Sequence, residues 1–111
     1  MAEGYDQSCI TISPNGVCFQ VKYAEKARDN AGTVIAIKAK DGVVMGVEKI
    51  LVSKMLVEGS ERRIFAIDKH ISLTFTGLVS DGRYLAGHAR EEASSYEGQY
   101  GQPIPGGVRS I

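Results

Sequence analysis

The apolar residues of the chain first gather in two neighbouring runs that predict a β-hairpin. Residues 33–40 and 43–48 are rich in β-branched side chains and are separated by Asp41-Gly42, a dipeptide typical of a tight hairpin turn. Both runs are almost continuously apolar at their centres. Strands of this kind are usually covered on both faces, so we expect cover on two sides of this pair.

A second pair of apolar runs repeats this arrangement further along the chain. Residues 64–67 and 71–76 read as strands and are joined across Asp68-Lys69. The segment between the two pairs, residues 53–63, is polar and irregular and predicts a loop.

Helical spacing of apolar residues appears before the first strand pair. The sequence Ser-Pro-Asn-Gly at residues 13–16 predicts a turn, because proline fixes φ at the second position and Asn-Gly tolerates the positive φ that follows. Residues 18–29 then predict a helix, which Asn30 and Gly32 end. Its apolar stripe consists of Phe19, Tyr23, Ala24 and Ala27.

A longer amphipathic helix is predicted after the second strand pair. Its apolar face consists of Leu78, Gly82, Leu85, Ala86, Ala89, Ala93 and Tyr96. Residues 101–107 contain two prolines and three glycines and predict a loose tail. The expected order is therefore turn, helix, hairpin, hairpin and long helix, which is an α+β arrangement.

Composition excludes several classes of partner. The 111 residues allow at most one domain, and 13 acidic residues balance 13 basic ones, so we expect no nucleic acid and no membrane among the partners. The acidic start of the chain does not resemble a signal peptide. Cys9 and Cys18 form neither a CxxC motif nor a disulfide framework, and we interpret them as small apolar residues of a reducing compartment. The expected location is the cytoplasm and nucleus.

Candidate metal ligands are few. His88, Glu91 and Glu92 follow helical spacing, but a zinc site needs three or four ligands of the right type, and no second histidine or cysteine is near. We interpret them as a solvated, salt-bridged helix face, and His70 as a surface residue. No metal and no cofactor are expected.

A second candidate is a threonine nucleophile. Thr33 opens a strand, Glu48 ends its hairpin partner and Arg63 precedes the next strand, an arrangement that is comparable with hydrolases whose amino-terminal threonine attacks the substrate. Thr33 is internal, so its nitrogen is an amide and cannot accept a proton. Arginine also stays protonated in proteins and cannot exchange a proton as lysine does. The site is therefore non-catalytic unless the chain is cut before Thr33.

Five collinear motifs carry a resemblance to a known family. They are "GYD" at residues 4–6, "SPNGVCFQVKYA" at 13–24, "KDGVVMGVEK" at 40–49, "TGLVSDGR" at 76–83 and "AREEAS" at 89–94. The chain resembles the amino-terminal half of alpha-type subunits of the 20S proteasome, in particular the eukaryotic alpha-type subunit seven.

The resemblance implies a fold and its boundaries. The expected fold is the amino-terminal part of an Ntn-hydrolase-type αββα sandwich, with the first helix, two antiparallel strand pairs and the long helix, and with the second half missing. Residues 1–17 would form a gate segment and Pro turn, residues 18–105 a partial alpha-type domain, and residues 106–111 a divergent tail.

The resemblance also implies a function. The chain would be a non-catalytic structural and gating subunit in a seven-membered alpha ring that takes part in ubiquitin-dependent protein degradation. Its partners would be the other alpha subunits, the beta-ring subunits and the carboxyl-terminal tails of proteasome activators. Two alternatives remain: a hydrolase that uses Thr33 after processing, and a truncated variant that does not assemble.

Two groups of site residues follow from the motif match. The gate cluster is Tyr5, Asp6, Pro14 and Tyr23. The activator pocket, which the resemblance places between neighbouring subunits, is Gly16, Lys22, Arg63 and Gly77. The sequence departs from the family at two of these positions. Lys22 stands where a glutamate is usual, and Arg63 stands where a lysine is frequent.

Overall fold

A computed structural model of the chain describes residues 4–106. Its elements follow one another as α1 (Phe19–Asp29), β1 (Val34–Lys38), β2 (Val43–Val47), β3 (Ile64–Asp68), β4 (Ile71–Thr74) and α2 (Val79–Tyr100). The predicted helix, two antiparallel strand pairs and long helix are thus confirmed. The first residues of the expected gate segment (1–3) and most of the expected divergent tail (107–111) lie outside the described residues.

Each strand pair is a separate antiparallel hairpin. In the first, Val34 lies opposite Val47 and Lys38 opposite Val43. The turn closes where the Ala39 N–H donates to the Gly42 carbonyl at 2.7 Å, as the Asp-Gly dipeptide predicts.

The second hairpin is less regular. Its register shifts between Ala66 and Asp68, so a bulge interrupts the ladder before the turn. The two hairpins are linked where the Thr76 hydroxyl donates to the Gly32 carbonyl at 2.7 Å.

Both helices end as the sequence predicts. Asn30 caps α1, and its N–H donates to the Lys26 carbonyl at 3.2 Å. Gly101 caps α2 with φ of 64°, a left-handed conformation that glycine adopts without strain, and its N–H donates to the Glu97 carbonyl.

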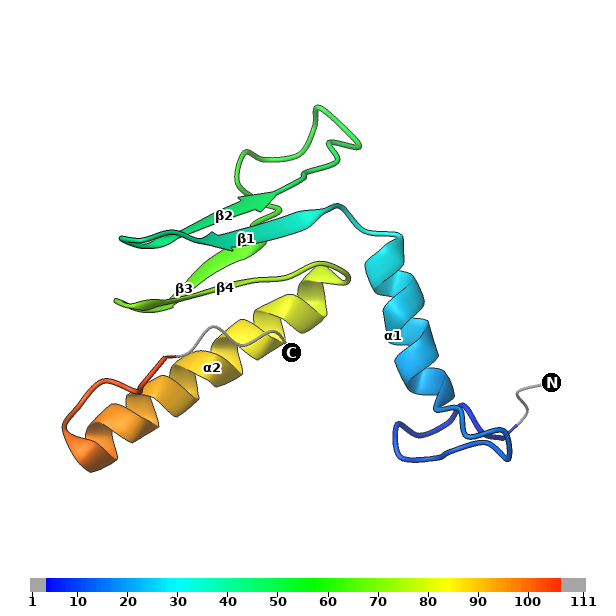
Figure 1. Cartoon of the computed structure of the whole chain (residues 1–111). Helices are drawn as coiled ribbons and strands as arrows, with labels where there is room; N and C mark the ends of the chain where they lie inside the picture. The colour runs from blue at the N-terminus through cyan, green and yellow to red at the C-terminus, as the bar shows by residue number, and fades with distance from the viewer. Residues whose placement is uncertain (1–3, 107–111) are drawn as a thin grey trace.

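α2 packs against the second hairpin (Figure 1). Ala86 and Ala93 on its inner face are 1% and 6% exposed. Gly82 lies against the Phe75 ring, which stacks on the Phe65 ring with centroids 5.8 Å apart. Arg90 adds two hydrogen bonds to the Ala66 carbonyl, at 3.0 and 2.8 Å.

α1 stands apart from this region, beyond the amino-terminal end of β1 (Figure 1). None of its residues is buried. Its contacts with other segments include the hydrogen bonds of Gln20 and Tyr23 with Asp6 and the approach of Gly77 to Arg28.

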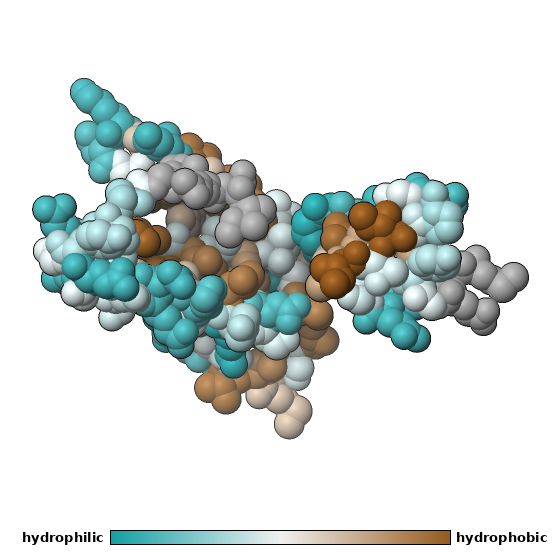
Figure 2. Space-filling model, turned by 90° about the horizontal axis from the view of Figure 1, so that it is seen from below, coloured by the Kyte–Doolittle hydropathy of each residue, from teal (hydrophilic) through white to brown (hydrophobic). Residues whose placement is uncertain are grey.

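The chain leaves an unusual amount of surface open for its mass. Its accessible surface is 9250 Å², whereas a compact 12.0 kDa protein exposes about 6,000 Å². Its radius of gyration is 17.3 Å, against about 13 Å for a compact domain of this length. Apolar areas accordingly interrupt the polar surface in Figure 2.

The expected cover on both faces of the first strand pair is therefore absent within residues 4–106. Ile35, Ile37 and Val44 are 56%, 61% and 67% exposed. The apolar sequence of these strands is suited to a cover that no other described part of the chain supplies.

Candidate functional site

The predicted gate cluster lies at the amino-terminal end of α1, and the structure joins two of its four members. The Tyr23 hydroxyl lies 3.4 Å from the Asp6 Oδ2 atom. The side chain of Gln20, one turn earlier on the same helix, donates to the Asp6 carbonyl. Asp6 is thereby attached to α1 through both its side chain and its backbone.

Sequence reasoning did not single out Gln20. The signal that could have found it is its position three residues before Tyr23, which places both side chains on one face of the helix. Tyr5 and Pro14, the other members of the predicted cluster, are exposed and make no side-chain hydrogen bond in the described structure.

The turn before α1 is a closed unit. The Gly16 N–H donates to the Ser13 carbonyl at 2.8 Å, and the Ser13 N–H donates to the Val17 carbonyl at 2.9 Å. The Ser13 hydroxyl also accepts from the Val17 N–H at 3.2 Å, and Ser13 is only 9% exposed. Gly16 has φ of 74°, so the sequence prediction of a positive φ at this turn is confirmed.

Two of the four predicted activator-pocket residues meet near the start of α2. The Arg63 Nη1 atom donates to the Gly77 carbonyl at 3.1 Å, and the guanidinium lies 6.0 Å from the centre of the Phe75 ring. The Arg63 carbonyl in turn accepts from the Thr74 hydroxyl at 3.1 Å. Arg63 is therefore fixed in place, and its remaining guanidinium N–H groups can still bind an anion.

The other two predicted pocket residues lie elsewhere in the chain. Gly77 lies beside Arg28 in the last turn of α1, whereas Gly16 precedes the first turn. An 11-residue helix is about 16 Å long, so Gly16 and Gly77 are separated by about that distance. Lys22 is exposed on α1 and pairs with Glu25 at 3.1 Å.

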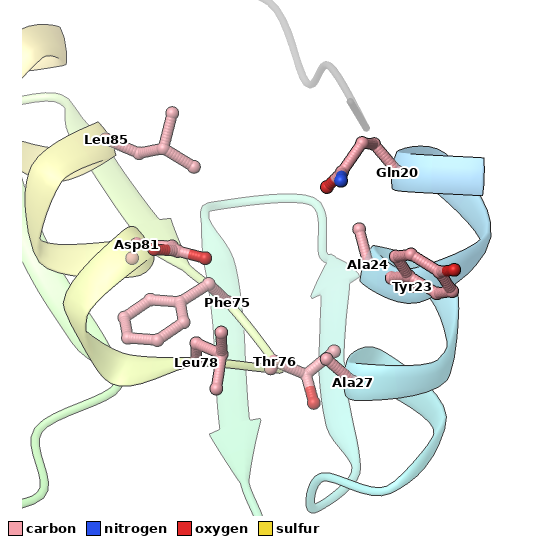
Figure 3. A pocket seen from close by; sticks show the side chains of 11 residues that line it. Gln20, Tyr23, Ala24, Ala27, Phe75, Thr76, Leu78, Asp81 and Leu85 are labelled. Carbon is pink, nitrogen blue, oxygen red and sulfur yellow. The ribbon is translucent and has the colours of Figure 1, made fainter. Parts of the chain in front are cut away.

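A groove of about 350 Å³ separates α1 from the start of α2 (Figure 3). The α1 side carries Gln20, Tyr23, Ala24 and Ala27, and the opposite side carries Phe75, Thr76, Gly77, Leu78, Asp81, Gly82 and Leu85. Most of these side chains belong to the two apolar stripes that the sequence predicts. The groove itself was missed, because helical periodicity shows that a stripe exists but not what lies opposite it.

The Thr33 region is arranged around the Glu48 carboxylate. The Thr33 N–H donates to Glu48 Oε2 at 2.9 Å. This backbone hydrogen bond, helped by the Thr33 side chain, lowers the pKa of the Glu48 carboxyl below its usual value. A methyl group at Gly32 would lie 2.5 Å from the Glu48 carbonyl oxygen, so this segment approaches β2 closely.

The Thr33 nitrogen cannot act as the base for the Thr33 hydroxyl. An amide nitrogen that already donates a hydrogen bond cannot accept a proton, and the ionised Glu48 carboxylate receives that hydrogen bond. Arg63 is held by Gly77 and stays protonated. The mechanism of an amino-terminal threonine therefore requires that the chain be cut before Thr33, so that its nitrogen becomes an amine.

The histidines lie outside these regions. His88, Glu91 and Glu92 are exposed on α2, as the prediction of a solvated helix face requires. None of the three forms a salt bridge within residues 4–106, so the salt-bridged part of that prediction is not found. His70 is also exposed, and its Nε2 atom lies 2.7 Å from the Ile104 carbonyl oxygen. Residues 4–106 contain no group of three or more side chains placed to hold a metal ion. No helix among the same residues has the length and apolarity needed to cross a membrane.

Comparison with known proteins gives a consistent family. The family model described as proteasome subunit matches residues 28–111. A proteasome subunit alpha type-3 from Oryza sativa subsp. japonica is 55% identical over 101 residues, which are 91% of this chain and 41% of the relative. The corresponding protein from Dictyostelium discoideum is 53% identical over 105 residues, 95% of this chain and 42% of the relative.

Relatives named alpha type-7 match as well. The one from Schizosaccharomyces pombe is 45% identical over 105 residues, covering 95% of this chain and 41% of the relative. The chain thus spans about two fifths of the length of the relatives it matches. The expected likeness to alpha-type subunits is confirmed, and the chain belongs to the proteasome subunit family.

Proposed function

We propose that the chain is a non-catalytic structural subunit of the proteasome alpha ring. The observation that carries the proposal is the exposed apolar surface of an otherwise well-formed helix and hairpin framework. The chain exposes about 3,000 Å² more surface than a compact protein of the same mass, whereas one side of a standard protein–protein interface buries about 800 Å². A chain with this much open surface is suited to an assembly in which the rest of an alpha-type subunit and the neighbouring subunits cover it.

The non-catalytic part of the proposal rests on Thr33. Its nitrogen is an internal amide that donates to Glu48, so the chemistry of an amino-terminal threonine is unavailable to the uncut chain. We assign proteolysis within the assembly to other subunits.

The gating role rests on the attachment of Asp6 to α1. Two hydrogen bonds, from Tyr23 and Gln20, hold the segment that precedes the turn against the helix. In the proposed ring this segment borders the axial pore, and the Asp6–Tyr23 contact fixes its direction. The neighbouring turn at residues 13–16, which hydrogen bonds of Ser13 and Gly16 close, joins this segment to α1.

Activator docking is proposed at a pocket shared by two subunits. Gly16 and the Arg63–Gly77 pair lie at opposite ends of α1, about 16 Å apart, so a short peptide tail cannot contact both closely within one chain. A pocket between neighbours can combine the Arg63 side of one subunit with the Gly16 side of the next. The Arg63 guanidinium then pairs with the terminal carboxylate of an activator tail.

The proposed location is the cytoplasm and nucleus, and the proposed process is ubiquitin-dependent protein degradation. The partners are the other alpha subunits, the beta-ring subunits and activator tails. No nucleic acid and no membrane are proposed.

The docking proposal is tested with Arg63→Gln in an assembled ring, with Arg62→Gln as the matched control. Arg62 is the exposed neighbour and makes no hydrogen bond in the described structure, so its loss removes the same charge without the pocket contact. A charge-assisted hydrogen bond contributes about 1.5–3 kcal/mol, so Arg63→Gln should weaken binding of a tail peptide by about ten- to a hundredfold. Equal affinities for the two variants, or equal affinities for a peptide with a free and an amidated carboxyl terminus, would exclude the proposed contact.

A further inference from the structure

Cys9 and Cys18 lie against each other at the start of α1, although their sequence spacing does not suggest a pair. The Cys18 thiol donates to the Cys9 carbonyl oxygen at 3.2 Å. A carbonyl oxygen is separated from its own Cα by two bonds of about 1.2 and 1.5 Å, so the Cys18 sulfur lies within about 6 Å of the Cys9 Cα. Disulfides join residues whose Cα atoms are about 4.4–6.8 Å apart. A bond between the two sulfurs therefore requires the Cys9 side chain to turn toward the Cys18 thiol and the segment around Cys9 to shift.

The turn at residues 13–16 produces this proximity. Two backbone hydrogen bonds, Ser13 N–H to the Val17 carbonyl and Gly16 N–H to the Ser13 carbonyl, reverse the chain between the two cysteines. The approach of the two cysteines is thus a consequence of a specific local fold.

Both thiols are accessible, and the segment between them can adjust. Cys9 is exposed and Cys18 is partly exposed. Ile10 and Ile12 next to Cys9 are 85% and 64% exposed, so no packed core resists a small displacement of this segment. Neither thiol belongs to the groups that hold Asp6 on α1.

We propose that Cys9 and Cys18 form a reversible intrachain disulfide when the chain meets a small-molecule disulfide such as oxidised glutathione. The thiolate of one cysteine attacks a glutathione sulfur, forms a mixed disulfide and releases one glutathione thiolate. The second cysteine thiolate attacks the protein sulfur of that mixed disulfide, forms the Cys9–Cys18 bond and releases the second glutathione. The protein is oxidised by two electrons, oxidised glutathione is reduced to two thiols, and the two protein protons pass to the released thiolates.

The bond closes a loop around the turn and tethers the amino-terminal segment to the first residue before α1. In a reducing compartment such a bond is transient and reports oxidation, and reduced glutathione reverses it. The disulfide would tether the segment that carries Asp6. Any effect of the disulfide on pore gating therefore rests on the proposed function of that segment. Formation of the bond does not rest on that function.

The test equilibrates the 111-residue chain with glutathione buffers of graded redox ratio, in native buffer and in concentrated guanidinium. Free thiols are then blocked and the intact mass is measured. An intrachain bond lowers the mass by two hydrogen atoms, and peptide mapping locates it. Because the fold holds the Cys18 thiol against the Cys9 backbone, we expect the equilibrium constant for the bond to be at least about tenfold larger in native buffer than in denaturant.

A matched control moves one thiol by a single residue. The double variant Ser8→Cys/Cys9→Ser keeps two thiols and nearly the same loop length. Its equilibrium constant for the disulfide should be no larger in native buffer than in denaturant. Cys18→Ser should give only a glutathione adduct on Cys9, which verifies the mass assignment. Glutathione adducts or interchain dimers without the intrachain bond would overturn the proposal. It would also be overturned if the equilibrium constant rose equally, from denaturant to native buffer, for the native and the shifted cysteine pairs.

Discussion

Replacing Gly82 by alanine tests the packing of α2 on the second hairpin. A Cβ atom at this position would lie 2.2–2.4 Å from three atoms of the Phe75 ring. Carbon atoms in contact are normally about 3.5–4.0 Å apart, so the ring must move by more than about 1 Å. That ring also stacks on Phe65 and lies beside the Arg63 guanidinium, and both contacts weaken when it moves.

The expected net effect follows from three contributions. Overpacking of a close contact costs about 1–3 kcal/mol, and loss of an aromatic stack costs about 0.5–1.5 kcal/mol. Alanine in place of glycine inside a helix returns about 1 kcal/mol. We therefore expect Gly82→Ala to lower the free energy of unfolding by about 1–3 kcal/mol.

The same helix offers a matched control at Gly87. A Cβ atom there meets nothing within 4 Å, so Gly87→Ala should raise the free energy of unfolding by about 0.5–1 kcal/mol through helix propensity alone. Urea unfolding followed by circular dichroism measures both variants, and hydrogen exchange of the α2 amides localises the effect. If Gly82→Ala stabilises the chain as much as Gly87→Ala does, the described packing is wrong. In the background of Phe75→Ala, the cost of Gly82→Ala should disappear.

Three further predictions concern the Thr33 region and α1. The purified chain should cleave no fluorogenic peptide, and cleavage that Thr33→Ala abolishes with the fold retained would refute the non-catalytic assignment. Glu48 has a lowered pKa in the folded state, so its hydrogen bond contributes stability that is present above the ordinary value of 4.5 and is lost as pH falls through the lower folded value. Glu48→Gln should therefore make the melting temperature depend less on pH in acid. If the difference in melting temperature between the wild type and this variant stays constant as pH falls, the prediction is contradicted. Lys22→Glu breaks the exposed pair with Glu25 and should cost less than about 1 kcal/mol of stability, while modestly strengthening binding of tyrosine-containing activator tails to an assembled ring. Equal tail affinities at two salt concentrations would place Lys22 outside the pocket.

The elements of the fold could be predicted because their signals are local. Asp41-Gly42 marks the first hairpin turn, and the structure closes that turn where expected. Asn30 and Gly101 end the two helices for reasons that the sequence shows directly. The bulge between Ala66 and Asp68 has no comparable signal, since it depends on how two strands align with each other.

The site could be predicted only in part, because its contacts join residues far apart in the sequence. Motif matching named Asp6 and Tyr23, and the structure places them in contact, but Gln20 was missed. Motif matching also grouped Gly16 with Gly77 in a pocket between subunits, and one chain holds these two residues at opposite ends of α1. The pocket itself stays a prediction.

The burial of the first hairpin could also be predicted only in part. The apolar centres of β1 and β2 predict cover on both faces, yet Ile37 and Val44 remain exposed. Sequence pattern shows that a face is suited to burial, but not which segment buries it.

Assembly with the other alpha-type subunits tests the central claim most directly. The chain would be co-expressed with them, and the purified product would be analysed by native mass spectrometry and by the intact mass of each released subunit. The account predicts a ring that contains one copy of this chain with the peptide between Gly32 and Thr33 uncut. A ring without the chain would instead support a variant that does not assemble, and a ring-bound chain that begins at Thr33 would contradict the non-catalytic role.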